Sequence, residues 1–328
     1  MDGGSNRVYA GFQDGRLSDT NVCASRPGGA EEDDVVPVGA GGPYPSFWAT
    51  VGRRPARRRP GVVDDYEWPA GERPLRIVVV GKGGAGKSVV AGTMTRILAR
   101  RGRRVLALDT DPVPGLARSV GITPVPTPPL AGAVEQAEGG CWRLKEGIGP
   151  VRAVQRFSTL APDGVRVLNV GDHPLGGVQP VTPSAQAFYQ VIHGLPEAKA
   201  LRAWTMIGDH PAGPRQTTHD WAPYADTMLV VVEPTWKSAL TARRLVELAA
   251  AREAGVFPVA TKVTSRGDAE RVAEIVGLPA AATIPADEAV LESDRLGVAL
   301  IDHAPSCAAV RAIEDLVDRL VDGKVATR

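Results

Sequence analysis

The chain has 328 residues, a formal net charge of +1 at pH 7 and 43% apolar residues. This length can hold one large α/β domain with tails or two ordinary domains, and the apolar content suffices for a buried core. The near-neutral charge gives no reason to expect that the chain as a whole binds nucleic acid or membranes. The three cysteines, Cys23, Cys141 and Cys307, are far apart. Their spacing argues against a zinc site or a disulfide framework and fits a reducing compartment.

The N-terminal part differs from the rest of the chain. Residues 1–72 are rich in Gly, Pro, Asp and Arg and have no sustained apolar period, which predicts a disordered extension before a folded domain at residues 73–328. The basic run Arg53–Arg59 would suit docking to a partner, an anionic lipid surface or nucleic acid, but we favour a solvated linker. No apolar run approaches the ~18 residues of a membrane span and no signal peptide is visible, so we expect a cytoplasmic protein.

A glycine-rich loop organises the folded part. Gly81–Ser88 reads GKGGAGKS and matches the phosphate-binding loop G-x-x-x-x-G-K-[ST]. The apolar run Leu75–Val80 precedes it and helical spacing over Val89–Arg101 follows it, so the loop joins a strand to a helix. Lys87 can reach the β and γ phosphates of ATP and Ser88 can ligate Mg²⁺. The residues predicted to bind the nucleotide here are Gly81, Gly83, Gly84, Ala85, Gly86, Lys87, Ser88 and Val89.

The same loop also fits a dinucleotide-binding fingerprint. Gly81, Gly83 and Gly86 satisfy G-x-G-x-x-G, and Asp109 closes the next strand about 20 residues after the loop, where such a fold holds a ribose. A dinucleotide-dependent enzyme is therefore an alternative. The Lys-Ser pair directly after the last glycine has no function in that fold, which favours the triphosphate.

Acidic residues follow two other predicted strands. One strand ends in Asp109-Thr110-Asp111-Pro112, and another delivers Asp209-His210-Pro211-Ala212-Gly213. Because the carboxyl ends of parallel strands face one crevice, we expect these segments to meet the loop. An acid followed four residues later by a glycine has the form of a γ-phosphate sensor. Asp209 would hold a Mg²⁺-bound or attacking water, and the N–H of Gly213 would meet the phosphate.

Strands and helices alternate along the folded part, which predicts an α/β fold with a doubly wound, mostly parallel sheet and helices on both faces. The predicted strands are Leu75–Val80, Arg104–Leu108, Val165–Val170, Ala203–Gly208, Thr227–Val232, Phe257–Lys262 and Ala281–Ile284. The predicted helices are Val89–Arg101, Ser184–Leu195, Ser238–Ala254, Asp268–Val276 and Ala308–Val321. The Pro/Gly-rich stretch from Thr123 to Gly149 is expected to be a loop or a small excursion outside the sheet.

With Lys82 added to Lys87, the loop has the deviant Walker A form KGGxGK[ST], and the chain resembles the MinD/ParA family of P-loop ATPases. The resemblance extends over most of residues 75–325. The segment from Asp109 looks like the family's switch I, and the segment from Asp209 looks like its switch II. The run VVVEPTWKSALTARRL is most similar to CooC-type maturation ATPases.

The resemblance implies an ATP-dependent homodimer that sandwiches two ATP molecules with Mg²⁺. Lys82 would cross to the phosphates of the other subunit, while Lys87 would bind the β and γ phosphates of its own. Asp111 would position or deprotonate the attacking water, and Asp209 would hold Mg²⁺ through water. In the similar late segments of the family, residues matching Lys262, Pro285 and Asp287 border the nucleotide. Slow hydrolysis gated by dimerisation would suit a switch.

The chain departs from its apparent relatives at three places. CooC-type proteins carry metal-binding cysteines where this chain has Gly176–Pro180, so handling of a metal other than Mg²⁺ is not implied. Thr261 stands where the family usually has Asn, which would alter adenine selection. His210 occupies a position that is normally small and hydroxylated. It would sense pH or phosphate, or it is simply tolerated.

Three functions follow from these patterns. The first is a dimeric ATPase switch that acts in assembly, maturation or regulation of an unidentified protein client. The alternative is a spatial organiser on DNA or membranes, as ParA and MinD are. The mixed charges of the last helix, Ala308–Val321, argue against a basic membrane anchor. The dinucleotide-dependent enzyme is the remote third.

Overall fold

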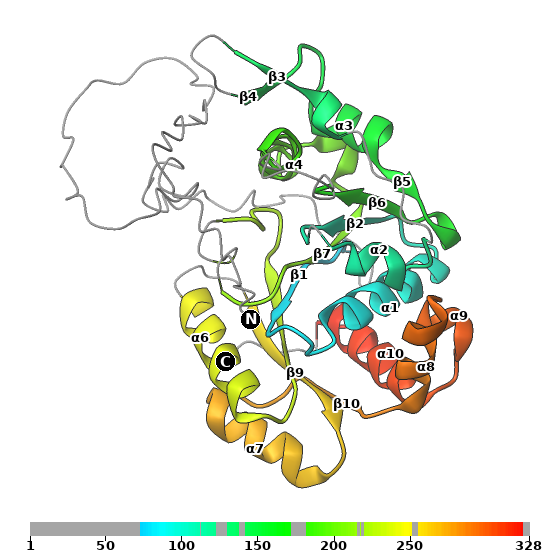
Figure 1. The fold of residues 1–328 in the computed structure, drawn as a ribbon, viewed down its shortest axis with the longest axis vertical. Coiled ribbons are helices and arrows are strands. Elements are labelled where there is room, and N and C mark those ends of the chain that lie inside the picture. Colours follow the sequence, from blue (N-terminus) through cyan, green and yellow to red (C-terminus); the bar gives the residue numbers. More distant parts are fainter. Residues whose placement is uncertain are drawn as a thin grey trace, which may run out of the picture.

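The computed structural model describes residues 73–111, 113–122, 130–137, 142–171, 182–214, 217, 220–250 and 255–323. The predicted extension with Arg53–Arg59, and the stretch Gly176–Pro180, lie outside these residues. Eight strands form one sheet in the order β10-β9-β8-β1-β7-β2-β6-β5 (Figure 1). Neighbouring strands pair in parallel except β5, which runs antiparallel to β6 at the edge. The predicted doubly wound sheet is therefore confirmed.

The strands of this sheet are short and mostly buried. They are β1 (Arg76–Gly81), β2 (Val105–Asp109), β5 (Thr159–Leu160), β6 (Arg166–Asn169), β7 (Thr205–Asp209), β8 (Thr227–Val232), β9 (Gly255–Val263) and β10 (Ala282–Pro285). The central strand β1 lies between β7 and β8, and strands that come later in the chain lie on both sides of it. Ligands of such open sheets bind at this kind of switch point, outside the carboxyl ends of the strands.

Helices cover both faces of the sheet (Figure 1). They are α1 (Lys87–Arg100), α2 (Gly115–Ser119), α3 (Pro150–Phe157), α4 (Thr182–Gly194), α6 (Trp236–Ala250), α7 (Arg266–Val276), α8 (Glu288–Leu296), α9 (Leu300–His303) and α10 (Ala308–Val321), with short 3₁₀ turns at Leu130–Ala133, Pro162–Gly164 and Lys199–Leu201.

Alternate residues of each strand enter different cores because successive side chains point to opposite faces. One core packs α1, α2 and α10 against residues such as Ile77, Val79 and Ala107. The opposite face carries two cores, one under α3 and α4 and one under α6 and α7. The sheet is thus buried on both sides, which explains its continuous apolar runs.

The structure adds elements that sequence patterns did not predict. Among these elements are helices α3 and α8 and the edge strand β5. The stretch from Thr123 to Gly149 contains a separate hairpin, β3 (Val134–Gln136) with β4 (Trp142–Leu144), outside the central sheet as expected. The hairpin and α3 pack in one cluster with residues such as Leu130 and Ala133.

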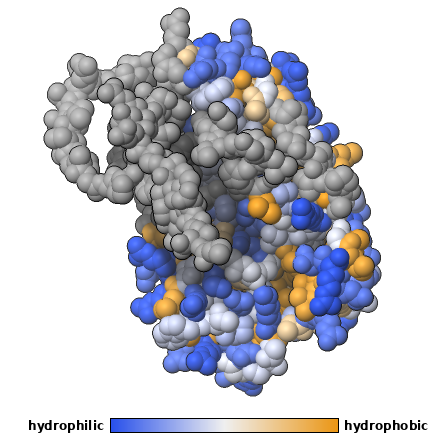
Figure 2. All heavy atoms as spheres, viewed as in Figure 1, coloured by the Kyte–Doolittle hydropathy of each residue, from blue (hydrophilic) through white to orange (hydrophobic). Residues whose placement is uncertain are grey.

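The described surface is mainly hydrophilic on the face drawn in Figure 2. Among the exposed large apolar side chains are Leu291 and Leu296 of α8 and Trp236 and Leu240 of α6. Within the described residues, no helix has the length and apolar character that crossing a bilayer requires. The buried face of α10 includes Val310, Ile313, Leu316, Val317 and Leu320.

Candidate nucleotide site

The loop after β1 has a backbone that glycine alone fits well. A Cβ on Gly81 would lie 2.4 Å from the carbonyl oxygen of Val231, so the loop leaves β1 in close contact with β8. Gly84 and Gly86 have φ of +80° and +91°, in the left-handed region that favours glycine. Space is open where a Cβ on either residue would project. The loop can therefore wrap a phosphate closely.

Helix α1 begins at Lys87, immediately after Gly86. The first N–H groups of a helix have no partner within it, and with the helix dipole they attract anions. The side chain of Lys87 is buried and its Nζ donates to the carbonyl oxygen of Lys82 at 3.4 Å. The loop, helix end and ammonium group together fit a polyphosphate.

Ser88 in the first turn of α1 reaches the end of β7. Its Oγ donates to Oδ2 of Asp209 at 2.5 Å. Oδ1 of Asp209 is buried and has no hydrogen-bond partner among the described residues. A Cβ on Gly115 would lie 2.6 Å from Oγ of Ser88, so α2 also begins against this hydroxyl. A hydroxyl beside an incompletely satisfied carboxylate provides the oxygen ligands that Mg²⁺ prefers, with phosphates and water completing the shell.

Three polar side chains share one row of the sheet. Asn169, Asp109 and Asp209 are in register across β6, β2 and β7, and side chains at one register level of parallel strands point to the same face. Asp109 is completely buried, and its two carboxylate oxygens accept the N–H groups of Asp111 and Ala117 at 3.2 Å each. This carboxylate braces the segment from Asp111 to α2. It is not exposed for the ribose of a dinucleotide, contrary to the alternative prediction.

Burial sets the charge state of both acids. Desolvation raises the pKa of Asp209 to about 7, against the hydrogen bond from Ser88 and the charge of Lys87. Desolvation and the neighbouring Asp209 also raise the pKa of Asp109. A cation placed beside Asp209 would reverse this effect, because a nearby positive charge stabilises the carboxylate form. The protein thus places a carboxyl group whose charged form is disfavoured by burial where a metal ion would stabilise that form.

The remaining switch residues lie beside this pair. Asp111 is half-buried and its Oδ1 accepts the N–H of Val113 at 2.9 Å. Its charge helps to raise the pKa of Asp209, which places it near the predicted metal site. Gly213 has a φ of +88° and donates to the carbonyl oxygen of Gly81 at 3.0 Å. The side chain of His210 is 2% exposed and is packed inside the protein.

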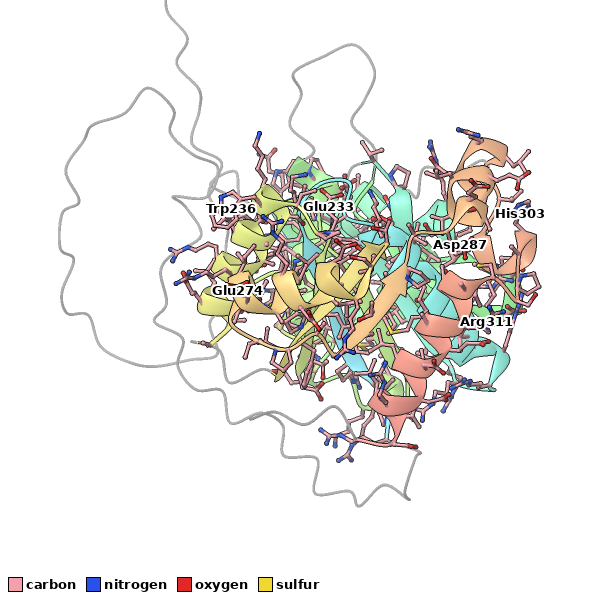
Figure 3. The ribbon with its side chains drawn as sticks, turned by 90° about the horizontal axis from the view of Figure 1, so that it is seen from below. Glu233, Trp236, Glu274, Asp287, His303 and Arg311 are labelled. Carbon is pink, nitrogen blue, oxygen red and sulfur yellow. The ribbon has the colours of Figure 1, made fainter. Side chains whose placement is uncertain are left out.

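Glu233, which follows β8, pairs with two lysines at the loop. Its Oε1 accepts from Nζ of Lys82 at 3.0 Å and its Oε2 accepts from Nζ of Lys262 at 3.3 Å. Burial opposes the charged form of Glu233, but hydrogen bonds from Lys82 and Lys262 outweigh it and lower its pKa. In the view of Figure 3, Glu233 lies between Trp236 and Asp287. The lysine predicted to serve a second subunit is thus paired within its own chain.

The predicted base-binding residues are engaged in structural contacts. Oγ1 of Thr261 donates to the carbonyl oxygen of Ala85 at 2.7 Å, so it supports the phosphate loop. Asp287 caps α8 through the N–H of Ala289 and also accepts the N–H of Ala309, each at 3.0 Å. Pro285 ends β10 directly before this capping segment. The assignment of base-binding residues stays a prediction.

Two residues of the site, Gly115 and Glu233, have contacts that the sequence did not predict. Gly115 had no motif to mark it, since its close approach to Ser88 arises between distant elements. Glu233 directly follows the predicted strand Thr227–Val232, but its pairing with Lys82 could not be read from a spacing of 151 residues. Among the described residues no group of three or more His, Cys, Asp or Glu side chains could hold a metal ion. A magnesium ion here would therefore depend on phosphate and water ligands as well.

Comparison with known families gives one match that covers most of the chain. Residues 77–307 match the family described as the CobQ/CobB/MinD/ParA nucleotide binding domain. Together with the geometry of the loop, this match favours a triphosphate over a dinucleotide.

Individual relatives agree with this assignment. An uncharacterised ATP-binding protein of Methanocaldococcus jannaschii is 27% identical over 239 residues, which cover 68% of this chain and 90% of that protein. The carbon monoxide dehydrogenase accessory protein CooC of Rhodospirillum rubrum is 26% identical over 247 residues, or 71% and 92% of the two chains. The septum site-determining protein MinD of Pyrococcus horikoshii, solved with Mg-ADP, has the same fold. Its TM-score is 0.58 at 18% identity, covering 78% of this chain and 100% of that one.

Proposed function

Since the chain belongs to the CobQ/CobB/MinD/ParA nucleotide-binding family, we propose that it is an ATPase switch that dimerises with ATP and acts on a protein client. The observation that carries the proposal is the 2.5 Å hydrogen bond between Ser88 and Asp209. This contact joins the phosphate loop to a carboxylate whose second oxygen has no partner within the described ranges. A site for Mg²⁺ and the β and γ phosphates is the arrangement it supports best.

The residues have separate tasks in this proposal. Lys87 and the N–H groups at the start of α1 bind the phosphates. Ser88 contributes a ligand to Mg²⁺, and Asp209 holds the ion through water; the bound ion supplies charge neutralisation on the phosphate oxygens. Asp111 orients the attacking water and accepts its proton. Gly213 joins the loop to switch II, so a γ phosphate would reach both segments together.

A second subunit would complete the site. Lys82 extends from the loop with a side chain that is 35% exposed, so it is accessible to a partner. A lysine from each subunit would add positive charge to the phosphates of the other, and hydrolysis would then depend on dimerisation. Such coupling favours a switch, whose bound state lasts until hydrolysis.

The class of client rests on the relatives. CooC is named as an accessory protein of carbon monoxide dehydrogenase, which makes assembly or maturation of another protein the function we propose for this chain. Asp111→Ala should slow hydrolysis and prolong the ATP-bound dimer. Capture of a protein by this variant with ATP, and not with ADP, would support the proposal.

The dimerisation experiment tests the proposal directly. Light scattering should show a dimer with ATP and a monomer with ADP. Lys82→Ala should bind ATP yet fail to dimerise, whereas Lys237→Ala, which removes an exposed lysine of α6, should behave as the unaltered protein. Normal dimerisation and hydrolysis by Lys82→Ala would overturn the two-subunit site.

A further inference from the structure

Glu233 has a set of contacts that the proposed ATPase reaction does not explain. Its carboxylate is 15% exposed and receives three side-chain donors. Lys82 and Thr235 donate to Oε1 at 3.0 and 3.3 Å, and Lys262 donates to Oε2 at 3.3 Å. The first of these donors is the lysine that the proposed dimer would send to the other subunit. Lys82 therefore cannot reach a partner without leaving Glu233.

The other two donors lower the free-energy cost of moving Lys82 away from Glu233. When Lys82 leaves Oε1, Thr235 still donates to the same oxygen and Lys262 still neutralises the carboxylate. Lys262 is held at the loop by a second contact, since its Nζ donates to the carbonyl oxygen of Gly84 at 2.6 Å. Its φ of +55° is unusual for a residue with a side chain. Removal of one partner from a partly buried ion pair is costly when the remaining charge is left alone. Here the charge of Glu233 is not left alone, because Lys262 stays beside it.

The alternative ligand for Lys82 is more highly charged than Glu233. The terminal phosphates of ATP carry more negative charge than one carboxylate, and hydrogen bonds between ionised groups are stronger as the charges increase. ADP lacks the γ phosphate and offers Lys82 less in exchange. Because Glu233 and the nucleotide of the partner subunit compete for Lys82, ATP would release Lys82 from Glu233 more readily than ADP.

From these contacts we infer that Glu233 is a positioning residue that keeps Lys82 within its own subunit and sets the ATP concentration at which two copies of this chain pair. The inference rests on the proposed dimeric ATPase. Glu233 touches neither nucleotide nor water in this role and acts through Lys82. Its side chain lies beside the start of α6, where Trp236 is also exposed (Figure 3).

The test compares three proteins of full length. The unaltered chain, Glu233→Gln and Glu247→Gln are titrated with a non-hydrolysable ATP analogue, and dimer is measured by analytical ultracentrifugation. Glu247 lies on α6 and pairs with Arg243 and Arg244 at the surface, so its substitution removes the same charge away from the loop. Glu233→Gln should dimerise at about tenfold lower analogue concentration, the effect of one hydrogen bond to a charged group. Glu247→Gln should match the unaltered chain.

A second variant acts in the opposite direction. Lys262→Met removes the cation that would remain on Glu233, so release of Lys82 becomes harder and dimerisation should need more analogue. Binding of the analogue to monomers at low protein concentration is measured for each variant, which separates dimerisation from loss of nucleotide affinity. Equal dimerisation curves for Glu233→Gln and the unaltered chain would overturn the inference, as would weaker dimerisation by Glu233→Gln at equal monomer affinity.

Chemical labelling separates failure of the inference from failure of the proposed function. Acetylation of Lys82 in nucleotide-free protein, followed by mass spectrometry, should be slower than acetylation of exposed Lys237 and should accelerate in Glu233→Gln. If labelling responds in this way but the unaltered chain never dimerises, the proposed dimeric function fails. If the chain dimerises but labelling of Lys82 ignores Glu233, the inference fails while the dimer stands.

Discussion

Oγ of Ser88 and Oδ2 of Asp209 lie 2.5 Å apart although 121 positions separate the two residues. The contact joins the beginning of α1 to the end of β7, and the other oxygen of Asp209 finds no hydrogen-bond partner in the part of the chain that the structure describes. A buried, half-satisfied carboxylate destabilises a protein unless something else compensates it. A cation beside Asp209 would compensate this carboxylate.

Asp209→Asn should separate stability from function. Because the pKa of Asp209 is raised to about 7, the folded state loses stability as the pH rises from the carboxyl's usual value near ~3.9 to about 7. The variant lacks this loss and should be more stable than the unaltered protein at pH 8 without Mg²⁺. Its Mg²⁺-dependent ATP affinity should fall by about 10- to 100-fold, as for other partners of metal-bound groups. Urea unfolding at pH 5 and pH 8 and calorimetric titration measure the two effects, with exposed Asp226→Asn as control.

Lys87→Ala should abolish most nucleotide binding while the protein remains folded. Among the described residues, its ammonium group donates to the carbonyl oxygen of Lys82 at 3.4 Å. Hydrogen bonds to charged groups contribute ~1.5–3 kcal/mol, which corresponds to a loss of about 10- to 100-fold. Titration with a fluorescent ATP analogue measures this loss of affinity. Unchanged affinity would refute the phosphate-loop assignment.

Gly115→Ala should disturb the metal site from the side of α2. The added Cβ would lie 2.6 Å from Oγ and 3.2 Å from Cβ of Ser88, so either α2 or the serine must move. Overpacking of this kind costs ~1–3 kcal/mol, and Mg²⁺-dependent ATP hydrolysis should decrease. Gly149→Ala is the matched control, because a Cβ there meets no atom within 4 Å. Equal hydrolysis by both variants would contradict the close contact.

Arg96 offers a stability prediction away from the nucleotide. Its side chain is 2% exposed and donates to Asp163 at 2.6 Å, to Asp302 at 2.8 and 2.9 Å, and to the carbonyl oxygen of Val120 at 2.8 Å. Arg96→Ala should lower the free energy of unfolding by about 1–3 kcal/mol, since the buried carbonyl loses its donor. Arg100→Ala, which removes a half-exposed arginine from the same two acids, should cost less. Chemical denaturation measures the free energy of unfolding of both variants. Equal losses would show that burial of Arg96 adds nothing to its stabilising effect.

Acid should weaken the same cluster. Burial opposes the charge of Asp163, but hydrogen bonds from Arg96 and Arg100 dominate and lower its pKa. A depressed pKa contributes stability above the unfolded value, near ~3.9, and this contribution is lost as the pH falls through the folded value. Stability should therefore decline below about pH 4. Asp163→Asn should reduce the decline in urea unfolding experiments, and an unchanged pH profile would exclude Asp163 as its source.

Much of the fold follows from local patterns. The run of residues 77–80 before Gly81 is apolar on every residue because β1 is covered on both faces, and that pattern predicts a central strand without knowledge of its neighbours. The edge elements were harder to predict. Strand β5 has two residues and α8 has few buried side chains, so neither leaves a periodic signal, and each depends on contacts with distant segments.

The prediction of a phosphate loop needs the sequence alone, because the glycines, Lys87 and Ser88 are contiguous and their conformations depend on neighbouring residues. The sequence also indicated that acids at strand ends would converge there. Which partner each acid takes became visible in the three-dimensional structure. Asp209 accepts a hydrogen bond from Ser88, and both oxygens of Asp109 accept backbone N–H groups. Glu233 forms an ion pair with Lys82. These assignments depend on strand order and on packing between segments far apart in the chain, which residue spacing does not encode.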